Sequence, residues 1–351
     1  MVRLRRRKTH VGRSELAKPG GGAPLRALCH AIVLLYLLSR LGPSPGLAED
    51  DLPPTHSVEP ELHATGFEFA EGPAFDCDGN LYVVNYRGNG NIGRITTDGT
   101  ASVFCDLREL VPVEDRLPQA NGLKVDREGR LIASDSGAGR LLRIAADGQS
   151  AEVLANRCEG KHFNSENDVA MDLEGNIFFS DPGGSDAEHP IGSIYRYDIK
   201  TAEVALLADG LAFPNGLGVT PDQRYLCLSE SQRYRILIFD LEADGTVSNQ
   251  RVLIDFPRKT VGPIIGGDHD PDGLIFDKQG RLYVAMWTAG AVNVVDVASG
   301  KLLRQYDAGG SQATNLHFHG GYLYTTVAAK EAVFRLKLGV EGFDYNGCTG
   351  Q

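Results

Sequence analysis

The sequence has no hydrophobic run long enough to cross a bilayer. Its longest apolar segment, Ala27–Leu38, covers 12 residues, whereas a transmembrane helix needs about 20. Helical periodicity is also missing over any long window, which argues against a helical solenoid. None of the six cysteines stands in C-x-x-C spacing, so the chain lacks the usual pattern of zinc and thiol redox sites.

Positive charge is scarce outside the first 48 residues. Those residues carry nine of the 35 Lys and Arg side chains, and the apolar run and small residues that follow the basic segment lead to Ala48. This order predicts a signal peptide over residues 1–48, cleaved before Glu49, and therefore a secreted or periplasmic protein. An uncleaved membrane anchor is the alternative. The remainder has 26 basic and 45 acidic residues, a formal charge of −19, which excludes a basic nucleic-acid-binding surface.

Five cysteines remain after the leader is removed, and export makes a disulfide possible. Cys77 and Cys105 lie closest to each other in a shared repeat, and they are the pair that we expect to be bonded. The alternative is that all five are small buried residues. The five are Cys77, Cys105, Cys158, Cys227 and Cys348.

A short phrase recurs six times along the chain. Its first residue is always Glu, Asn or Asp, and the intervals between successive copies are 50, 46, 48, 57 and 43 residues. A period in this range indicates a stack or ring of supersecondary units. The first residues of the six copies are Glu71, Asn121, Asn167, Asn215, Asp272 and Asn315.

Each repeat contains four short segments with the composition of β-strands. In most copies a glycine such as Gly79 or Gly129 stands eight residues after the first position, between two apolar runs, which is typical of a β-hairpin. A second hairpin follows, and four strands per repeat correspond to one propeller blade. We therefore predict an all-β fold, a single six-bladed β-propeller over residues 52–351. The segment after Leu52 is expected to add an outer strand to the last blade and close the ring.

In a propeller the first strand of each blade lines the central channel, so the six polar residues are expected to meet at one channel mouth. Two carboxylates and four side-chain amides form an all-oxygen cluster, which suits a hard cation such as calcium. The alternative is that these residues only cap strands, because Asn and Asp are common in turns. They lie five residues upstream of the hairpin turn, however, and burying them without a partner would be costly.

A second set of acidic residues follows the first hairpin turn of three repeats. The strand after the turn runs back toward the predicted channel mouth, so these residues are expected to rim it and bind substrate hydroxyls. Turn capping is the alternative interpretation. The residues are Asp135, Asp181 and Glu230. Among the aromatic residues of the strands, Trp287 is the one candidate for stacking on a substrate.

Four longer phrases resemble the gluconolactonase / senescence marker protein (regucalcin) family of lactonases. The similarity runs from about Phe67 to Val327 and keeps the order and spacing of all four phrases. They read Phe69-Ala70-Glu71-Gly72-Pro73, Phe163-Asn164-Ser165-Glu166-Asn167-Asp168-Val169, Phe213-Pro214-Asn215-Gly216-Leu217 and Asp270-Pro271-Asp272-Gly273.

The resemblance implies a six-bladed propeller with a divalent metal in its channel. Its ligands would be Glu71, Asn167, Asn215 and Asp272, and it places Asn121 near the site as a substrate contact. Calcium is the expected ion, with zinc or magnesium as alternatives. The chain departs from mammalian-type members directly before Asn167, where Ser165 and Glu166 replace an Arg and a Phe, so the sugar contacts of those members need not carry over.

The activity that the resemblance implies is opening of a small-molecule lactone or ester by a water that the metal activates. We expect Asp272 to act as general base, with Glu71 as second choice. Aldonolactones, homoserine lactones, aromatic lactones and phosphotriesters all suit this chemistry. One alternative is a paraoxonase-like arylesterase or lactonase with a histidine base, for which His317 and His269 are candidates. Another is a non-catalytic propeller that binds a partner and is stabilised by calcium.

Overall fold

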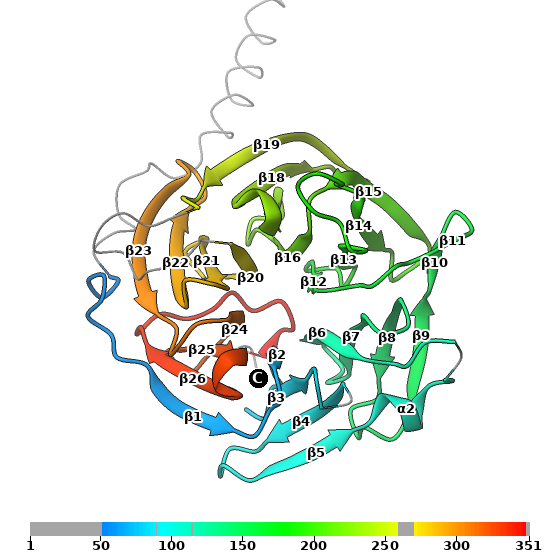
Figure 1. Ribbon diagram of the computed structural model, residues 1–351, viewed down its shortest axis with the longest axis horizontal. Coiled ribbons are helices and arrows are strands. Elements are labelled where there is room, and N and C mark those ends of the chain that lie inside the picture. The colour runs from blue at the N-terminus through cyan, green and yellow to red at the C-terminus, as the bar shows by residue number, and fades with distance from the viewer. Residues whose placement is uncertain (1–50, 89, 114, 259–269, 349–351) are drawn as a thin grey trace, which may run out of the picture. The chain divides into compact units, whose positions relative to one another are not determined.

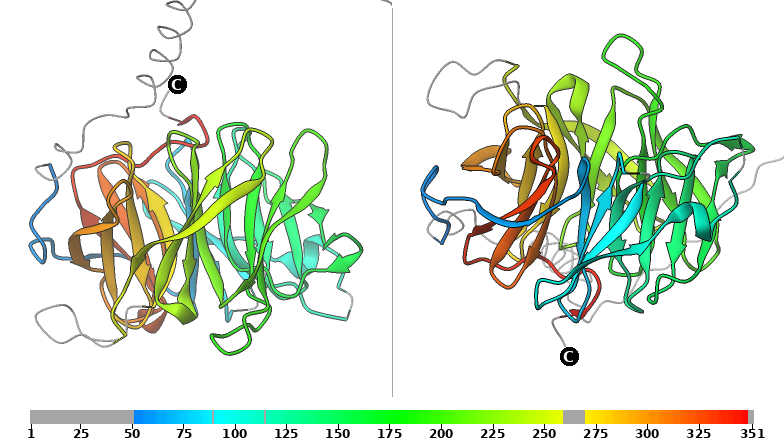
Figure 2. Two further views of the ribbon diagram at one scale, coloured as in Figure 1. Left: turned by 90° about the horizontal axis from the view of Figure 1, so that it is seen from above. Right: turned by 60° about the horizontal axis from the view of Figure 1, so that its bottom comes forward.

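The computed structural model describes residues 51–348 except 89, 114 and 259–269. Within these residues, six four-stranded antiparallel sheets surround a central axis as the blades of a propeller (Figure 1). The predicted all-β, six-bladed fold is therefore confirmed. In Figure 2 the blades stand side by side around the ring, and the C-terminal segment lies at one of its two faces.

Each blade is a meander of four strands whose first strand lies innermost. The blades are β2 (Ala70–Phe75), β3 (Leu81–Asn85), β4 (Asn91–Ile95), β5 (Ala101–Cys105); β6 (Ala120–Val125), β7 (Leu131–Asp135), β8 (Arg140–Ile144), β9 (Ala151–Ala155); β12 (Val169–Met171), β13 (Ile177–Asp181), β14 (Gly192–Tyr197), β15 (Val204–Leu211); β16 (Pro214–Val219), β17 (Tyr225–Glu230), β18 (Arg235–Leu241), β19 (Val247–Asp255); β20 (Pro271–Phe276), β21 (Arg281–Met286), β22 (Ala291–Asp296), β23 (Lys301–Asp307); and β24 (Ala313–His319), β25 (Tyr322–Val327), β26 (Ala332–Lys337), β1 (Glu61–Thr65).

The remaining elements are short connections. A small two-stranded hairpin lies between the second and third blades in the sequence, and three single helical turns follow β5, β17 and β25. They are β10 (Arg157–Cys158), β11 (Lys161–His162), α2 (Leu107–Leu110), η1 (Ser231–Arg233) and η2 (Ala328–Lys330). In the part of the chain that the structure describes, no helix is long and apolar enough to span a membrane.

The N-terminal strand closes the ring. Strand β1 pairs with β26 in antiparallel register, with Glu61 opposite Arg335 and Thr65 opposite Ala332. The sixth blade is thus built from both ends of the chain, as the sequence analysis predicts.

The first hairpin of each blade has left-handed backbone at its turn, at one residue in the first five blades and at both Gly320 and Gly321 in the sixth. Gly79 has φ +80° and Gly280 has φ +83°, a region that glycine enters without steric cost. In the fourth blade Gln223 takes the same place and adopts φ +59°. The turn therefore keeps its geometry although the glycine is absent, which explains why the fourth copy still forms a blade.

The second residue of the recurring phrase is glycine because adjacent inner strands pass very close to it. A Cβ added at Gly72 would lie 2.3 Å from the carbonyl oxygen of Asn121, and one added at Gly216 would lie 2.4 Å from that of Asp272. Real side chains do not tolerate such distances. The glycines therefore let the inner strands converge, which brings the residue before each glycine to the channel.

The cysteine pairing differs from the expectation. Cys77 bonds to Cys348, 271 residues away in sequence, and Cys105 is a free, buried thiol, as are Cys158 and Cys227. Cys77 follows the inner strand β2, whereas Cys105 ends the outer strand β5 at the opposite end of the blade. The C-terminal segment crosses the central channel (Figure 1) and brings Cys348 to Cys77.

Candidate metal centre at one mouth of the channel

One cavity of about 270 Å³ collects five of the six residues that begin the recurring phrase. Four of them are the second residue of an inner strand, and the fifth stands just before β12, so the repeated position in sequence becomes a repeated position around the channel. The five residues are Glu71, Asn121, Asn167, Asn215 and Asp272. The four expected metal ligands and the expected substrate contact thus share one site.

Three carboxylates line this cavity, those of Glu71, Asp270 and Asp272. Two of them are almost entirely buried, with 6% of Glu71 and 8% of Asp272 exposed. Burial, followed by the charge of Asp168, raises the pKa of Glu71 to about 8. The pKa of Asp272 is also raised well above its usual range, first by burial and then by the charge of Glu71. No Lys, Arg or His is among the described residues that line the cavity. Its negative charge therefore has no positive side chain to balance it there.

Asp168 does not line the cavity, but its charge acts on Glu71 and Asp272, and the sequence analysis did not single it out. It is 1% exposed and accepts hydrogen bonds from Asn315 Nδ2 over 3.1 Å and from the N–H of Val169 over 2.8 Å. It occupies the place that is glycine in four other copies, and its Oδ1 fills the space where Gly122 has no side chain. The sequence therefore did mark Asp168, because in this copy an acidic residue replaces the glycine of the recurring phrase.

Asn315, the first residue of the sixth copy of the recurring phrase, is buried but does not line the cavity. Its amide binds Asp168, and its own Oδ1 accepts the N–H of Leu316 over 2.8 Å. The side-chain oxygen of Asn315 is therefore occupied by a backbone hydrogen bond. The side-chain N–H of Asn315 orients the carboxylate of Asp168.

The donor set fits a hard divalent cation. It combines two carboxylates with side-chain amides, all of which offer oxygen, the ligand type that calcium and magnesium prefer. Within the described residues, no three His, Cys, Asp or Glu side chains are grouped as a metal cluster, so the amide oxygens of Asn167 and Asn215 are a necessary part of such a site. A bound cation would balance the buried charge that raises the pKa of both carboxyl groups.

Aromatic side chains form the walls around these polar groups. Phe69, Tyr86, Phe213 and Trp287 line the cavity, and the ring of Phe69 lies 5.4 Å from that of Trp287 and 5.3 Å from that of Tyr86, centroid to centroid. Phe69 and Phe213 precede Glu71 and Asn215 by two residues. Both phenylalanines have positive φ, +65° and +57°. Bulky residues rarely adopt this conformation, which here turns both rings into the site.

The second set of acidic residues does not rim the mouth, and that expectation is wrong. Asp135, which is fully buried, accepts the N–H of Gln119 over 2.7 Å and pairs with Arg140 over 2.7 Å. It thereby fixes the loop that enters the inner strand β6. The same arrangement recurs with Asp181 and the N–H groups of Asn164 and Ser165, and with Glu230, the N–H of Ala212 and the guanidinium of Arg235.

The two residues that depart from the mammalian-type pattern point away from the cavity. Ser165 donates its hydroxyl to the carbonyl of Ser136 over 3.0 Å. Glu166 is fully buried and neither of its carboxyl oxygens has a hydrogen-bond partner, and its burial raises its pKa well above the usual range. Neither residue lines the cavity, so neither replaces the missing sugar contacts.

Among the described residues, no histidine lines the cavity that holds Glu71 and Asp272, called the acidic cavity below. His317 lines a different cavity at the other end of the inner strands. Its Nδ1 is 2.9 Å from the carbonyl oxygen of Phe318, and burial lowers its pKa to about 3. His269, the other candidate base, lies outside the described residues.

Comparison with known proteins agrees with the resemblance read from the sequence. The family model described as "SMP-30/Gluconolactonase/LRE-like region" matches residues 69–329. The chain is 27% identical to a gluconolactonase of Zymomonas mobilis, with 64% of this chain and 66% of that protein covered. It is 28% identical to the diisopropyl-fluorophosphatase of Loligo vulgaris, with 71% and 82% covered.

Among solved structures, a gluconolactonase from Xanthomonas campestris superposes with a TM-score of 0.64 at 25% identity. That match covers 85% of this chain and 99% of the other. The family match spans most of the propeller and includes every residue of the acidic cavity, from Phe69 to Trp287. This protein is therefore a member of the SMP-30/gluconolactonase/LRE-like family.

Proposed function

We propose that this protein is an exported, metal-dependent hydrolase that opens a lactone. Glu71, Asn167, Asn215 and Asp272 would hold a divalent cation, with calcium the first choice and zinc or magnesium the alternatives. The observation that carries the proposal is the meeting of these buried oxygen donors in one cavity with no basic side chain among its described lining residues. The relatives named gluconolactonase and diisopropyl-fluorophosphatase are both hydrolases of small molecules, which supports it.

The residues of the cavity can divide the chemistry among them. When bound, the cation would polarise the carbonyl of the substrate and lower the pKa of a water molecule. A carboxylate oxygen of Asp272 would take the proton from the attacking water, and the hydrogen bond that Asp272 receives from Asn215 orients it. Asn121 would donate its amide N–H to a substrate oxygen. The aromatic walls keep bulk water away from the reacting groups.

The same cavity favours an uncharged substrate. Three carboxylates line it, and no cationic side chain is among the described residues around it, so its described side chains include none of the groups that usually bind a phosphate or carboxylate. Its volume of about 270 Å³ and its aromatic walls suit a small ring with an apolar face.

The test is a panel of lactones assayed by pH-stat with the protein as purified, after chelation, and after calcium, zinc or magnesium is restored. The panel holds an aldonolactone, a homoserine lactone, an aromatic lactone and a phosphotriester. We expect turnover of at least one lactone, lost on chelation and regained with the metal. A metal that raises the melting temperature while no substrate is hydrolysed would instead favour the non-catalytic binding module.

Export is tested separately. The proposal holds that the mature chain begins near Glu49, after removal of residues 1–48. Intact-mass measurement of protein recovered from the medium or periplasm is expected to give the mass of residues 49–351. A full-length chain retained in the cytosol would contradict it.

A further inference from the structure

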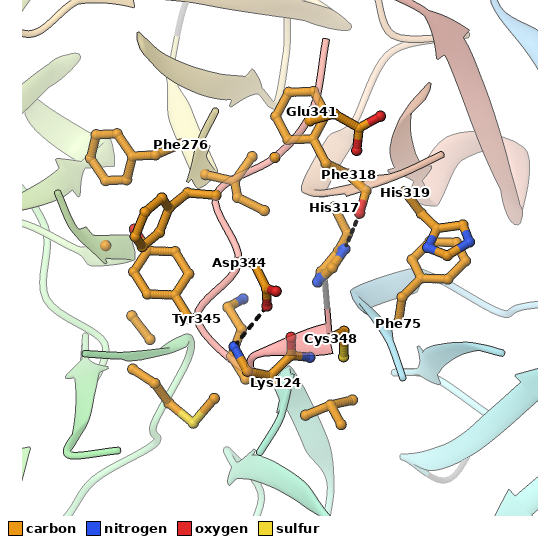
Figure 3. A pocket seen from close by; sticks show the side chains of 18 of the residues that line it. Phe75, Lys124, Phe276, His317, Phe318, His319, Glu341, Asp344, Tyr345 and Cys348 are labelled. Carbon is orange, nitrogen blue, oxygen red and sulfur yellow. Dashed lines mark hydrogen bonds between the residues drawn. The ribbon is translucent and has the colours of Figure 1, made fainter. Parts of the chain in front are cut away.

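A second cavity, of about 250 Å³, lies at the other end of the inner strands (Figure 3). It is lined by the last residues of these strands, among them Phe75, Val125, Met171, Val219 and Phe276. The acidic cavity is lined instead by the first residues of the same strands. No lining residue is common to the two cavities, and the second one is called the compartment below.

The C-terminal segment forms the outer wall of this compartment. Residues 341–348 contribute seven of its lining residues. They are fastened on several sides: Phe343 donates its N–H to the carbonyl of Phe276 over 3.0 Å, the hydroxyl of Tyr345 binds the carbonyl of Val219, and Cys348 is bonded to Cys77. A segment whose only role was to end the chain would not need to be fixed at so many points.

The wall is mostly apolar, with a small number of polar groups placed among aromatic rings. Figure 3 shows His317, Lys124 and Asp344 around the same space, with Phe276 and Tyr345 across from them. Lys124 and Asp344 carry opposite charges, and the carboxylates of Asp76 and Glu341 also line the space, so the wall does not favour an anionic occupant. An apolar pocket with a few converging polar groups is the usual form of a small-molecule site.

His317 supplies a hydrogen-bond acceptor to this space. Its Nδ1 lies 2.9 Å from the carbonyl oxygen of Phe318, a contact that requires the proton to sit on Nδ1. The ring stays neutral because it is buried, so Nε2 carries a lone pair and accepts a hydrogen bond. The matching group on an occupant is a hydroxyl.

We propose that this compartment is a second binding site, which takes a compact, uncharged, largely apolar molecule bearing one hydroxyl group. A dry cavity of about 150 Å³ holds benzene, so this larger one has room for two fused rings. The hydroxyl donates to His317 Nε2, and the rings pack against Phe276, Phe318 and Tyr345. The site is independent of the lactone chemistry proposed above, because it shares no lining residue with the acidic cavity.

The experiment uses three probes of the same shape: 2-naphthol, naphthalene and 2-naphthoate. Isothermal titration of the full protein, with its disulfide intact, is expected to rank 2-naphthol first, naphthalene weaker by about five- to tenfold for want of the hydrogen bond, and 2-naphthoate weakest. Tightest binding of the charged 2-naphthoate, or no binding of any probe, would overturn the proposal.

The variant His317→Phe keeps a ring and removes the acceptor. It is expected to weaken 2-naphthol by about five- to tenfold and to leave naphthalene within about twofold. Equal losses for both probes would show that the acceptor has no part in binding and would contradict the assignment. Trp287, the single tryptophan, lies in the acidic cavity, so its fluorescence reports binding there and is expected to stay unchanged.

A crystal soaked with 6-bromo-2-naphthol locates the site even if the variant does not fold. An anomalous bromine peak between Phe276 and His317, together with binding in solution, supports the proposal. A peak only in the acidic cavity, or a peak in the compartment with no binding in solution, which would mean binding at crystal concentration only, rejects it.

Discussion

At the scale of single residues, Asp272 differs from the other expected ligands because it is both a carboxylate and a hydrogen-bond partner of Asn215. The variant Asp272→Asn keeps its size and an oxygen ligand but cannot take a proton. We expect kcat on a lactone to fall by about 10² or more with metal in excess, while the melting temperature stays near that of the parent. Steady-state kinetics on metal-analysed samples measure this.

Asn121→Ala is the matched control for that variant, because Asn121 lines the same cavity but moves no proton. It is expected mainly to raise KM. If Asp272→Asn keeps nearly parental turnover with its metal bound, the assignment of the base is wrong, and Glu71 becomes the next carboxylate to test.

The raised pKa of Glu71 makes the stability of the chelated protein depend on pH. The folded state holds this proton up to about pH 8, whereas the usual value for a free Glu is 4.5. The unfolded state therefore binds fewer protons between these values, and the free energy of unfolding falls as pH rises from about 4.5 to 8, by at most about 1.4 kcal/mol per pH unit for one carboxyl.

Thermal melts of the chelated protein across this range are expected to show the decline, and melts with calcium restored are expected to be flatter, because a bound cation balances the charge. Glu71→Gln, which does not titrate, should have a shallower slope without metal. A chelated parent whose stability is constant from pH 5 to 8 would show that Glu71 has an ordinary pKa.

At the scale of elements, the acidic residues that end the second strands hold the loops that lead into the inner strands, by accepting hydrogen bonds from the backbone N–H groups of those loops. Asp135 is the clearest case, since it pairs with Arg140, whose side chain is 8% exposed. Asp135→Ala leaves that buried guanidinium without its partner and is expected to destabilise the fold by about 3–5 kcal/mol. Denaturant unfolding measures the loss.

Because Asp135 does not line the cavity, kcat per folded molecule in that variant should stay near the parental value. A parental unfolding midpoint combined with a large rise in KM would revive the role in substrate binding that the sequence suggested. Asp181→Ala is expected to behave in the same way, since Asp181 holds the N–H groups of Asn164 and Ser165.

Elements also show what could be predicted from the sequence and what could not. The blades and the expected metal ligands were predictable because the sequence repeats. Residues at the same place in successive repeats take the same place in successive blades around the ring. The role of Asp135 was not, since it depends on an N–H sixteen residues upstream that no pattern marks. Asp168 was visible only as a departure from glycine, and the path of the C-terminal segment leaves no periodic trace.

At the scale of the whole molecule, the disulfide joins the first blade to the end of the chain. Cys77 and Cys348 are 271 residues apart, and for so long a loop the chain-entropy model gives a stabilisation of about 5.6 kcal/mol. Disulfides often contribute less than this model gives, so we expect about 2–4 kcal/mol. Unfolding of the double variant Cys77→Ser/Cys348→Ser measures it.

Cys105→Ser is the control for that pair, because Cys105 is a free thiol in the same blade. It is expected to lower stability only by the cost of a buried hydroxyl and to leave the melting temperature as sensitive to added reductant as that of the parent. If reduction of the parent does not lower its melting temperature at all, the bond contributes nothing beyond the pairing of β1 with β26.

The shared sixth blade also dictates the order in which the molecule can be made. Strand β1 is among the first propeller residues to leave the ribosome, yet its partner β26 is synthesised after all the other blade strands. Five blades can therefore form during translation, but the nascent chain remains an open arc with an unpaired strand at its start. The ring can close only once β26 has been made, so a chain truncated before Ala332 would leave β1 without its partner.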